Sequence, residues 1–401
     1  MTRTVAVVGG GPAGLMAAEV VASSGAGAAV TVFERMPSVG RKLQLAGRGG
    51  LNLTHTEGLD AFLARYGAAG PRLAPAIEAF GPPDLRAWSA SLGQRAVVGT
   101  SGRVFPEAFR ATPLLRAWIA RLDGLGVDFR LCHTWRGWSD DGALRFEGGP
   151  PFPADATVLA LGGASWPRTG SDGGWTAPLG ATGIAVSRLR PANGGFRIAW
   201  SDHFRRRFGG TPLKNVGVRA GDRCGRGDAV ITSTGIEGGA VYAVGPALRD
   251  ALDAGGVATL HVDLRPDLTT TELARRLATR RRPKDSRSAT LRRAAGLTPV
   301  ATALLREAFE PGDGEGDLAG RIKGVRLTVT ATEAIERAIS TAGGIALDEV
   351  DERWMLRRRP GTFVAGEMLD WEAPTGGYLL QATFSTAVAA GRGVVQWLEE
   401  R

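Results

Sequence analysis

The residues best placed to do chemistry stand within the first 34 positions of the chain. Gly9, Gly11 and Gly14 have the spacing GxGxxG, follow the apolar run 5–8 and precede an apolar helical segment. In such a turn the first glycine bends the chain sharply, the second lets the backbone approach a pyrophosphate, and the third lets the helix pack closely on a sheet. Glu34 ends the next apolar run, where a carboxylate accepts both hydroxyls of an adenosine ribose. The pattern predicts a strand, a helix and a second strand that bind a dinucleotide, with its phosphates at the helix N-terminus.

The rest of the chain favours FAD as that dinucleotide. A GxGxxG sequence alone is weak evidence, since turns of this spacing also occur without a ligand and the chain has 58 glycines. Here residues 36–54 read as a long loop rich in glycine, arginine and lysine, which suits a large flat ligand. Two further apolar strands, 156–161 and 362–365, end in Gly162-Gly163 and Gly366-Glu367. A turn at 376–378 then leads into an apolar helix running to about residue 390, whose N-terminus would stabilise negative charge on a reduced flavin.

Six segments, in this order, resemble the successive blocks of the bacterial BaiN/RdsA-like FAD-dependent oxidoreductases. They read GRKLQLAGRGGLNLTH, SGRVFPEAFRAT, LALGGASWPRTGSDG, VITSTGIEGGAV, TAGGIALDEVD and FVAGEMLDWEAPTGGYLLQ, and the resemblance covers nearly the whole chain. The chain resembles a side branch, because many members have a cysteine in the loop 48–52 and an asparagine where Leu379 stands.

The resemblance implies a set of FAD contacts drawn from these blocks. Trp135 falls where a strand backbone touches the adenine, and Glu367 falls where related flavoproteins bind the ribityl chain with an aspartate. The implied cofactor-binding residues are Gly9, Gly11, Pro12, Ala13, Gly14, Glu34, Arg35, Arg41, Lys42, Asn52, Trp135, Gly163, Gly366, Glu367, Gly376, Gly377, Tyr378 and Leu379. NADPH or NADH is expected only as a transient electron donor, because the chain has a single GxGxxG.

The resemblance also implies reduction of a C=C bond conjugated to a carbonyl, either in ribosomal RNA uridine or in a bile-acid enone. Such a reaction needs a group that protonates the α-carbon. Tyr378 and His55 are the candidate acids, and Arg103 is a candidate for orienting a carbonyl or a phosphate. The alternatives are helix packing for Tyr378, a surface or capping role for His55 and a salt bridge for Arg103. Trp166 could stack on a ring, although a core position is the better expectation for an aromatic residue.

A run of basic residues raises the question of a nucleic-acid partner. The net charge is +9, and the run is opposed only by Asp285. Its members are Arg275, Arg276, Arg280, Arg281, Arg282, Lys284, Arg287, Arg292 and Arg293. Binding of ribosomal RNA through phosphate contacts and a solvated helix face are both open interpretations. The charge and the implied mechanism together favour uridine in ribosomal RNA as the substrate. The alternatives are a small-molecule amine or enone oxidoreductase and a non-enzymatic flavin-bound RNA-binding protein.

The predicted fold class is α/β, with a Rossmann-like FAD-binding domain, an inserted β-rich, barrel-like domain and a small helical lobe. The FAD-binding domain takes 1–187 plus 341–401, the β-rich substrate domain 188–266 plus 318–340, and the basic lobe 267–317. Thr269 and Glu272 predict the start of a helix in that lobe. Two cysteines and no Cys/His cluster predict neither disulfides nor a metal site, and a cytoplasmic location without membrane spans is expected.

Overall fold

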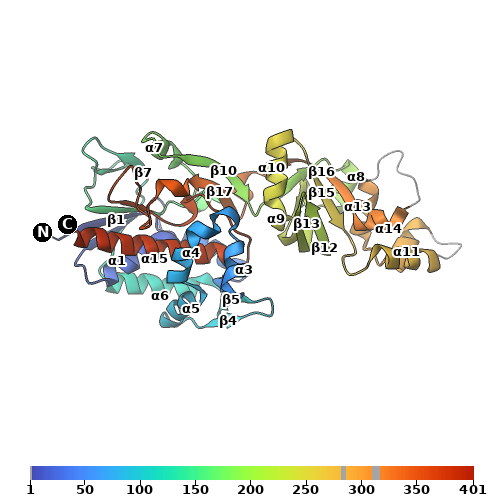
Figure 1. Ribbon diagram of the computed structural model, residues 1–401, viewed down its shortest axis with the longest axis horizontal. Coiled ribbons are helices and arrows are strands. Elements are labelled where there is room, and N and C mark those ends of the chain that lie inside the picture. The colour runs from blue at the N-terminus through green and yellow to red at the C-terminus, as the bar shows by residue number, and fades with distance from the viewer. Residues whose placement is uncertain (1, 281–285, 309–316) are drawn as a thin grey trace. The chain divides into compact units, whose positions relative to one another are not determined.

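The computed structural model describes residues 2–280, 286–308 and 317–401. The chain divides into two compact units (Figure 1). The first unit contains Met1–Arg190 and Ser340–Arg401, and the second contains Pro191–Ile339. The first unit is therefore built from both ends of the chain, and the second is an insertion.

The first unit is organised around a five-stranded parallel sheet with the strand order β18-β9-β1-β2-β6. Its strands are β1 (Thr4–Val8), β2 (Ala29–Glu34), β6 (Asp128–Leu131), β9 (Ala156–Leu159) and β18 (Thr362–Val364). The central strands are apolar and buried on both faces, as expected when helices cover a parallel sheet. Because all five strands are parallel, the loops that follow them meet at one edge of the sheet.

Two long helices, α1 (Pro12–Ser23) and α15 (Tyr378–Glu399), lie against each other in this unit (Figure 1). The approach is close because a Cβ atom at Gly391 of α15 would lie 2.9 Å from the Cβ atom of Val20 on α1. The helix α15 thus ties the C-terminal segment of the chain to the N-terminal nucleotide motif.

The remaining elements of the first unit are shorter than α1, except for the 14-residue helix α6. The helices are α2 (Arg41–Ala46), α3 (Leu59–Ala64), α4 (Gly70–Ala79), α5 (Pro82–Ser91), α6 (Ala111–Gly124) and α7 (Thr176–Gly180). The strands are β3 (Thr54–His55), β4 (Ala96–Val98), β5 (Arg103–Pro106), β7 (Trp135–Trp138), β8 (Leu144–Phe146), β10 (Val186–Ala192) and β17 (Ser340–Ile345). They form a three-stranded sheet β3-β5-β4 and the pairs β7-β8 and β10-β17.

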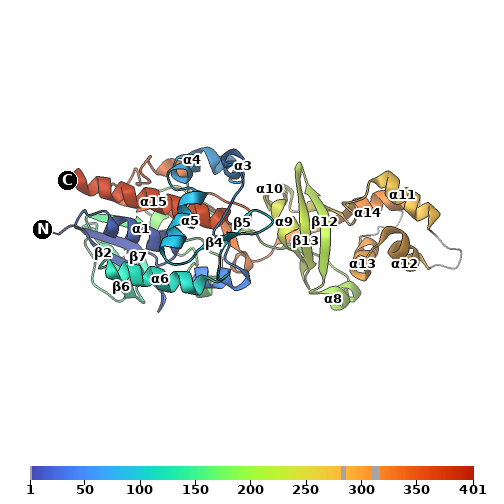
Figure 2. The ribbon, with the colours of Figure 1, turned by 90° about the horizontal axis from the view of Figure 1, so that it is seen from below.

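The second unit is built on a closed six-stranded barrel with the order β11-β14-β13-β12-β15-β16 (Figure 2). Its strands are β11 (Phe196–Ile198), β12 (Pro212–Ala220), β13 (Arg223–Ile231), β14 (Gly235–Glu237), β15 (Ala258–Asp263) and β16 (Val325–Thr332). Burial alternates along β16, where Val325, Leu327 and Val329 point into the core and the residues between them are exposed. This period of two is the pattern of strands that line a filled barrel.

Helices flank the barrel and share its hydrophobic core. They are α8 (Asp202–Phe208), α9 (Gly239–Ala243), α10 (Gly245–Gly255), α11 (Thr270–Thr279), α12 (Arg287–Thr290), α13 (Pro299–Glu307) and α14 (Leu318–Lys323), with a π-helical turn at Leu291–Ala295. The predicted cap of α11 is confirmed, because the Thr269 side chain accepts a hydrogen bond from the Glu272 N–H.

These observations confirm the α/β fold class, with a Rossmann-like sheet, a barrel and accompanying helices. Three local expectations need correction. The segment 36–54 is not one loop, because Gly40 in the left-handed conformation (φ 71°) starts helix α2, whose Leu43 is buried. The strand expected at 156–161 ends at Leu159, and the terminal helix continues to Glu399. Within the described ranges, no helix has both the length and the apolar character needed to cross a bilayer.

Candidate active site

The glycine turn after β1 forms the centre of the site. A Cβ atom at Gly9, where φ is 110°, would lie 2.3 Å from Ala160 O at the end of β9, and one at Gly14 would lie 1.8 Å from Gly9 O. A side chain at either position would clash with this backbone, so the packing requires glycine at both. A Cβ atom at Gly11 would meet nothing within 4 Å. Gly11 thus faces open space, as expected where backbone approaches a ligand.

The N-terminus of α1 leaves its backbone N–H groups available to an anion. Gly11 is its N-cap, Pro12 is its first residue, and no side-chain cap or acidic residue occupies the first turn. The free N–H groups and the helix dipole of such an end favour phosphate. The Ala13 side chain also fixes the neighbouring loop, because a Cβ atom at Gly366 would lie 2.7 Å from the Ala13 Cβ atom.

Glu34 stands at the end of β2, next to this turn. Its carboxylate accepts hydrogen bonds of 2.8 Å from the Gly10 N–H and of 2.8 Å from the Met36 N–H. Burial raises the pKa of Glu34, although these hydrogen bonds oppose the shift. The Glu34 carbonyl accepts from the His133 N–H, so the segment that leads to Trp135 passes beside the predicted ribose position. The buried Trp135 indole N–H has no hydrogen-bond partner in the described part of the chain.

Arg35 and Arg41 have different environments. The Arg35 guanidinium forms an ion pair with Asp172, so a carboxylate already holds the charge that was expected to meet FAD. Arg41 begins α2, where its Nη1 donates to Ser38 Oγ. Its Nε is buried and has no partner among the residues that the structure describes. Arg41 therefore keeps a donor that a ligand could use.

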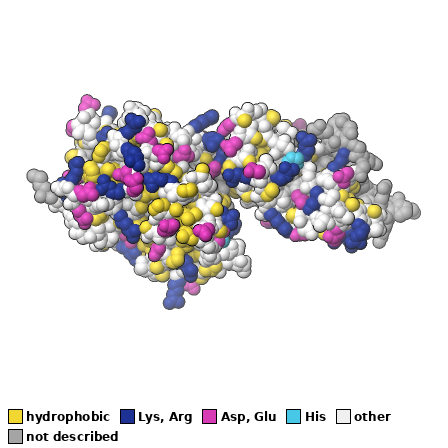
Figure 3. All heavy atoms as spheres, in the orientation of Figure 1, with side chains coloured by type: hydrophobic (Ala, Val, Ile, Leu, Met, Phe, Trp, Pro, Cys, Tyr) yellow, Lys and Arg dark blue, Asp and Glu magenta, His cyan; other side chains and the backbone are white. Residues whose placement is uncertain are grey.

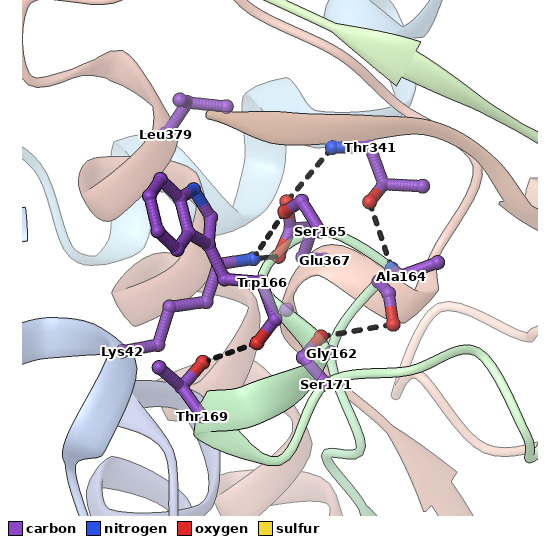
Figure 4. Close-up of polar contacts among 12 residues, drawn as sticks. Lys42, Gly162, Ala164, Ser165, Trp166, Thr169, Ser171, Thr341, Glu367 and Leu379 are labelled. Carbon is purple, nitrogen blue, oxygen red and sulfur yellow. Dashed lines mark hydrogen bonds and ion pairs between the residues drawn. The ribbon is translucent and has the colours of Figure 1, made fainter. Parts of the chain in front are cut away.

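Lys42 joins two distant segments of the chain at the same sheet edge (Figure 4). Its Nζ donates to Ser165 Oγ at 2.7 Å and to Glu367 Oε2 at 2.7 Å. The second Glu367 oxygen accepts from the Thr341 N–H at 2.9 Å. The Thr341 hydroxyl oxygen accepts from the Ala164 N–H at 2.8 Å. Sequence reasoning missed Ser165 and Thr341, since no local pattern connects positions so far apart.

Two tryptophans brace the glycine loops after β9 and β18. The Trp175 indole donates to Gly162 O at 2.8 Å, and the Trp371 indole donates to Gly366 O at 3.0 Å. Gly163 lies beside Thr341, whose Oγ1 would be 2.2 Å from a Cβ atom at that position. The two indoles were not predicted as supports, and only their placement in the fold reveals the role.

The turn before α15 also contributes to the candidate site, where it packs against β3. A Cβ atom at Gly377, the N-cap of α15 with φ 108°, would lie 2.4 Å from Thr54 O. No side-chain cap or acidic residue occupies the first turn of this 22-residue helix. Asn52 Oδ1 and Thr54 Oγ1 are buried without a hydrogen-bond partner among the described residues. Leu379 follows in the first helical turn and is partly buried.

This donor set fits FAD. The open space at Gly11 and the uncapped end of α1 suit a pyrophosphate, and Glu34 suits a ribose. The Asn52 and Arg41 atoms without partners, together with the uncapped end of α15, leave donors and acceptors for the rest of the molecule. Both Glu367 oxygens are already engaged, so a ribityl contact there would require Lys42 or Thr341 to share its acceptor.

The two candidate acids are already hydrogen-bonded inside the fold. The Tyr378 hydroxyl donates to Glu57, which also receives a bidentate ion pair from Arg65. Burial, followed by the Glu57 hydrogen bond, raises the pKa of Tyr378 well above its ordinary value. His55 Nδ1 accepts from the Glu57 N–H, and its Nε2 lies 2.9 Å from Ser101 O. This geometry favours the alternatives of helix packing for Tyr378 and a local structural role for His55.

The environment of Arg103 differs from that of the two candidate acids. It is exposed, and in the described part of the chain its guanidinium forms no ion pair, which removes the alternative of an internal salt bridge. It begins β5 beside the turn that starts α15, because a Cβ atom at Gly376 would lie 3.5 Å from Arg103 Nε. Arg103 therefore presents an unpaired cation at the site.

Trp166 requires a correction. A core position was the better expectation, but its side chain is 40% exposed and stands beside the Lys42 ion pair (Figure 4). The local sequence contains no signal for this exposure. Trp166 also has a left-handed backbone conformation, which is uncommon for a bulky residue.

The predicted basic run is divided in the structure. Arg275, Arg280 and Arg292 are exposed, whereas Arg293 is partly buried and Arg276 is held by Glu272 at 2.6 Å. Arg281, Arg282 and Lys284, and the side chain of Arg287, lie outside the described residues. On the face drawn in Figure 3, basic and acidic side chains are interspersed over both units.

No group of three or more described His, Cys, Asp or Glu side chains is arranged to hold a metal ion.

Comparison with known proteins agrees with this geometry. The profile of the HI0933-like protein Rossmann domain matches residues 3–393. The chain is 26% identical over 417 residues to a 3-dehydro-bile acid delta(4,6)-reductase of Clostridium scindens, covering 98% of this chain and 99% of that protein.

Solved structures with similar folds include two steroid dehydrogenases. The 3-ketosteroid delta1-dehydrogenase of Sterolibacterium denitrificans matches with a TM-score of 0.54 and 14% identity, over 98% of this chain and 100% of that one. The 3-ketosteroid-delta4-(5alpha)-dehydrogenase of Rhodococcus jostii RHA1 matches with a TM-score of 0.51 and 15% identity, over 98% and 97%. At this identity the two structures show a shared fold. Because the family profile spans nearly the whole chain, the chain belongs to the HI0933-like family and is an FAD-dependent oxidoreductase.

Proposed function

We propose that this oxidoreductase reduces a carbon–carbon double bond conjugated to a carbonyl group in a small molecule. Bound FAD supplies the redox chemistry, and the chain must bind and orient the substrate. The similarity along the full length to a protein named as a bile acid reductase supports this class of substrate.

The observation that carries the proposal is the unpaired Arg103 guanidinium beside the uncapped start of α15. When the β-carbon of an enone accepts a hydride, negative charge develops on the carbonyl oxygen. A fixed cation within reach of that oxygen stabilises the transition state more than the ground state. Arg103 would supply this cation. Its exposed guanidinium has no ion-pair partner among the described residues to displace, and the carbonyl oxygen itself would hold it in place.

The proton for the α-carbon is assigned to water in this proposal. The Tyr378 hydroxyl donates its hydrogen bond to Glu57, and both ring nitrogens of His55 lie next to backbone groups. Neither presents a free proton to the site, and both are therefore interpreted as supports of the loop that carries Arg103. NADPH or NADH is the proposed transient donor that reduces FAD.

Uridine in ribosomal RNA is the second candidate substrate, because its C5–C6 double bond is also conjugated to a carbonyl. The exposed Arg275, Arg280 and Arg292 favour it, since arginines at a surface can contact phosphates. Nucleoside mass spectrometry of ribosomal RNA from a strain lacking the gene tests this candidate. Loss of dihydrouridine at one position would support it, and an unchanged profile would remove it.

The test of the main proposal mixes anaerobically reduced holoprotein with 3-oxo-Δ4 steroids and simple enones. The expected result is loss of enone absorbance coupled to flavin reoxidation. Arg103→Gln should slow this step on the order of 100-fold. Arg95→Gln is the control, because Arg95 is an exposed arginine just before β4 in the same small sheet. Failure of the wild type to reduce any enone, or equal rates for the wild type and Arg103→Gln, would contradict the proposal.

A further inference from the structure

Trp166 is unusual among the tryptophans of this protein. All ten tryptophans lie in the described part of the chain, and Trp166 alone is exposed. No other described aromatic ring packs against its indole. With 40% of its surface in solvent and no aromatic neighbour, the indole leaves a face open to a flat ligand.

The backbone of Trp166 is held in a conformation that a bulky residue rarely adopts. Its φ and ψ are 58° and 59°, in the left-handed region. The carbonyl of Trp166 accepts hydrogen bonds from the Thr169 N–H at 2.8 Å and from Thr169 Oγ1 at 2.7 Å. Pro167 follows and begins a short 3-10 turn. Strain of this kind persists only where the surroundings enforce it, and it occurs most often at ligand and active sites.

The neighbours of Trp166 identify which part of the cofactor lies nearby. Ser165, the preceding residue, is fully buried and holds the Lys42 ammonium, which also binds Glu367. In Figure 4 the indole of Trp166 points toward Leu379, in the first turn of α15. Trp166 therefore directly follows the residue that binds the Lys42–Glu367 pair, and its indole points toward the helix whose N-terminus suits a reduced flavin (Figure 4). The turn that follows Trp166 ends at Gly170, where a Cβ atom would lie 3.4 Å from Glu34 Oε1. The turn therefore runs from the Lys42–Glu367 pair to the predicted ribose acceptor, and Trp166 is at the end that adjoins the pair.

We propose that the Trp166 indole packs against the isoalloxazine ring of bound FAD and positions it. An electron-rich indole in contact with a flavin stabilises the oxidised, electron-poor ring more than the reduced one, and it quenches flavin fluorescence by electron transfer. Trp166 is thus a positioning residue that also sets the redox potential. This role depends on FAD and is independent of the substrate proposed above.

The test compares Trp166→Phe with Trp166→Tyr. Both keep an aromatic ring, but only tyrosine is an electron donor strong enough to quench a flavin. The expected result for Trp166→Phe is a several-fold rise in the fluorescence of bound FAD and a higher midpoint potential, while Trp166→Tyr stays dim. Trp397→Phe is the control, because Trp397 lies near the other end of α15, 19 residues and about 28 Å along the helix from Tyr378.

The outcome that overturns the proposal is a folded Trp166→Phe holoprotein, with stoichiometric FAD, that has the fluorescence and midpoint potential of the wild type. Fluorescence and potential are measured without any substrate, so failure of the enone proposal would leave this result unchanged. If Trp166→Phe does not retain FAD while Trp397→Phe and Trp166→Tyr do, the loss itself supports the positioning role.

Discussion

The Lys42 ammonium lies 2.7 Å from the Glu367 carboxylate, although 325 positions separate the two residues in the chain. Their side chains are only 25% and 16% exposed, so the pair is shielded from solvent. The contact links the start of α2 to the loop after β18, and Glu367 in turn holds the Thr341 N–H. Two ends of the chain are thereby joined at the edge of the sheet.

Breaking this pair should destabilise the apoprotein. Lys42→Met leaves the Glu367 carboxylate without its ammonium partner, and the expected cost is about 2 kcal/mol in the free energy of unfolding. Lys42→Met with Glu367→Gln should recover part of that cost, because no unpaired charge remains. Urea denaturation of the wild type, both single variants and the double variant measures the coupling. Strict additivity of the two single changes would show that the pair is not coupled.

Gly11 and Gly14 should respond differently to the same added methyl group. At Gly11 a Cβ atom meets nothing within 4 Å, so Gly11→Ala is expected to leave the Tm of the apoprotein unchanged and to weaken FAD binding at least 100-fold, about 3 kcal/mol. At Gly14 a Cβ atom would lie 1.8 Å from Gly9 O, so Gly14→Ala should destabilise the apoprotein itself. FAD titration and thermal unfolding of both apoproteins separate the two effects. Equal Tm losses would contradict the different roles assigned to the two glycines.

Glu19 should be a strong determinant of stability away from the site. Its carboxylate accepts from the Trp88 indole at 3.1 Å and the Trp118 indole at 2.6 Å, and it forms an ion pair with Arg121. Glu19→Ala removes this buried carboxylate and leaves all three donors without their acceptor. The expected loss is about 3 kcal/mol in the free energy of unfolding, measured by urea denaturation. Glu78→Ala, at an exposed position on α4, is the control and should change stability by less than about 0.5 kcal/mol.

Glu57 should make stability depend on acid pH. The Arg65 hydrogen bonds, opposed by burial and aided by Tyr378, lower the pKa of Glu57 below its ordinary value of 4.5. A carboxylate with a lowered pKa contributes stability above its unfolded pKa and loses it as the pH falls through the folded value. The stability advantage of the wild type over Glu57→Gln should therefore be constant above about pH 5.5 and shrink below pH 4.5. Urea denaturation across this range measures it, and a constant difference down to pH 3 would contradict the assignment.

Local patterns were sufficient to predict the nucleotide motif. The turn at Gly9 and the position of Glu34 depend on short spacings, and so does the cap at Thr269. These features follow from neighbours in sequence, so they could be predicted before the fold was known. The FAD contacts as a set stay a prediction, although most of the residues lie along the same sheet edge.

Other features depend on contacts that no spacing encodes. Helix α2 begins at a left-handed Gly40, and nothing in residues 36–54 distinguishes that start from another loop glycine. The hydroxyl of Tyr378 is engaged by Glu57, 321 positions away, which the local sequence could not indicate. Trp166 was expected in the core because large aromatics are usually buried, but its side chain is 40% exposed, and no local pattern marks it apart from the buried tryptophans.

The division of the first unit between the two ends of the chain has a consequence for how the enzyme is made. The segments after β1 and β2 leave the ribosome early, whereas Glu367 and the start of α15 emerge only after the whole inserted unit has been translated. The predicted FAD contacts at Glu367 and at the start of α15 are therefore missing from a nascent chain that stops before residue 366. We therefore expect cofactor loading to be a late step in biogenesis. A chain truncated before β18 would leave the apolar strand β9 at the edge of an unfinished sheet, open to the quality-control machinery of the cell.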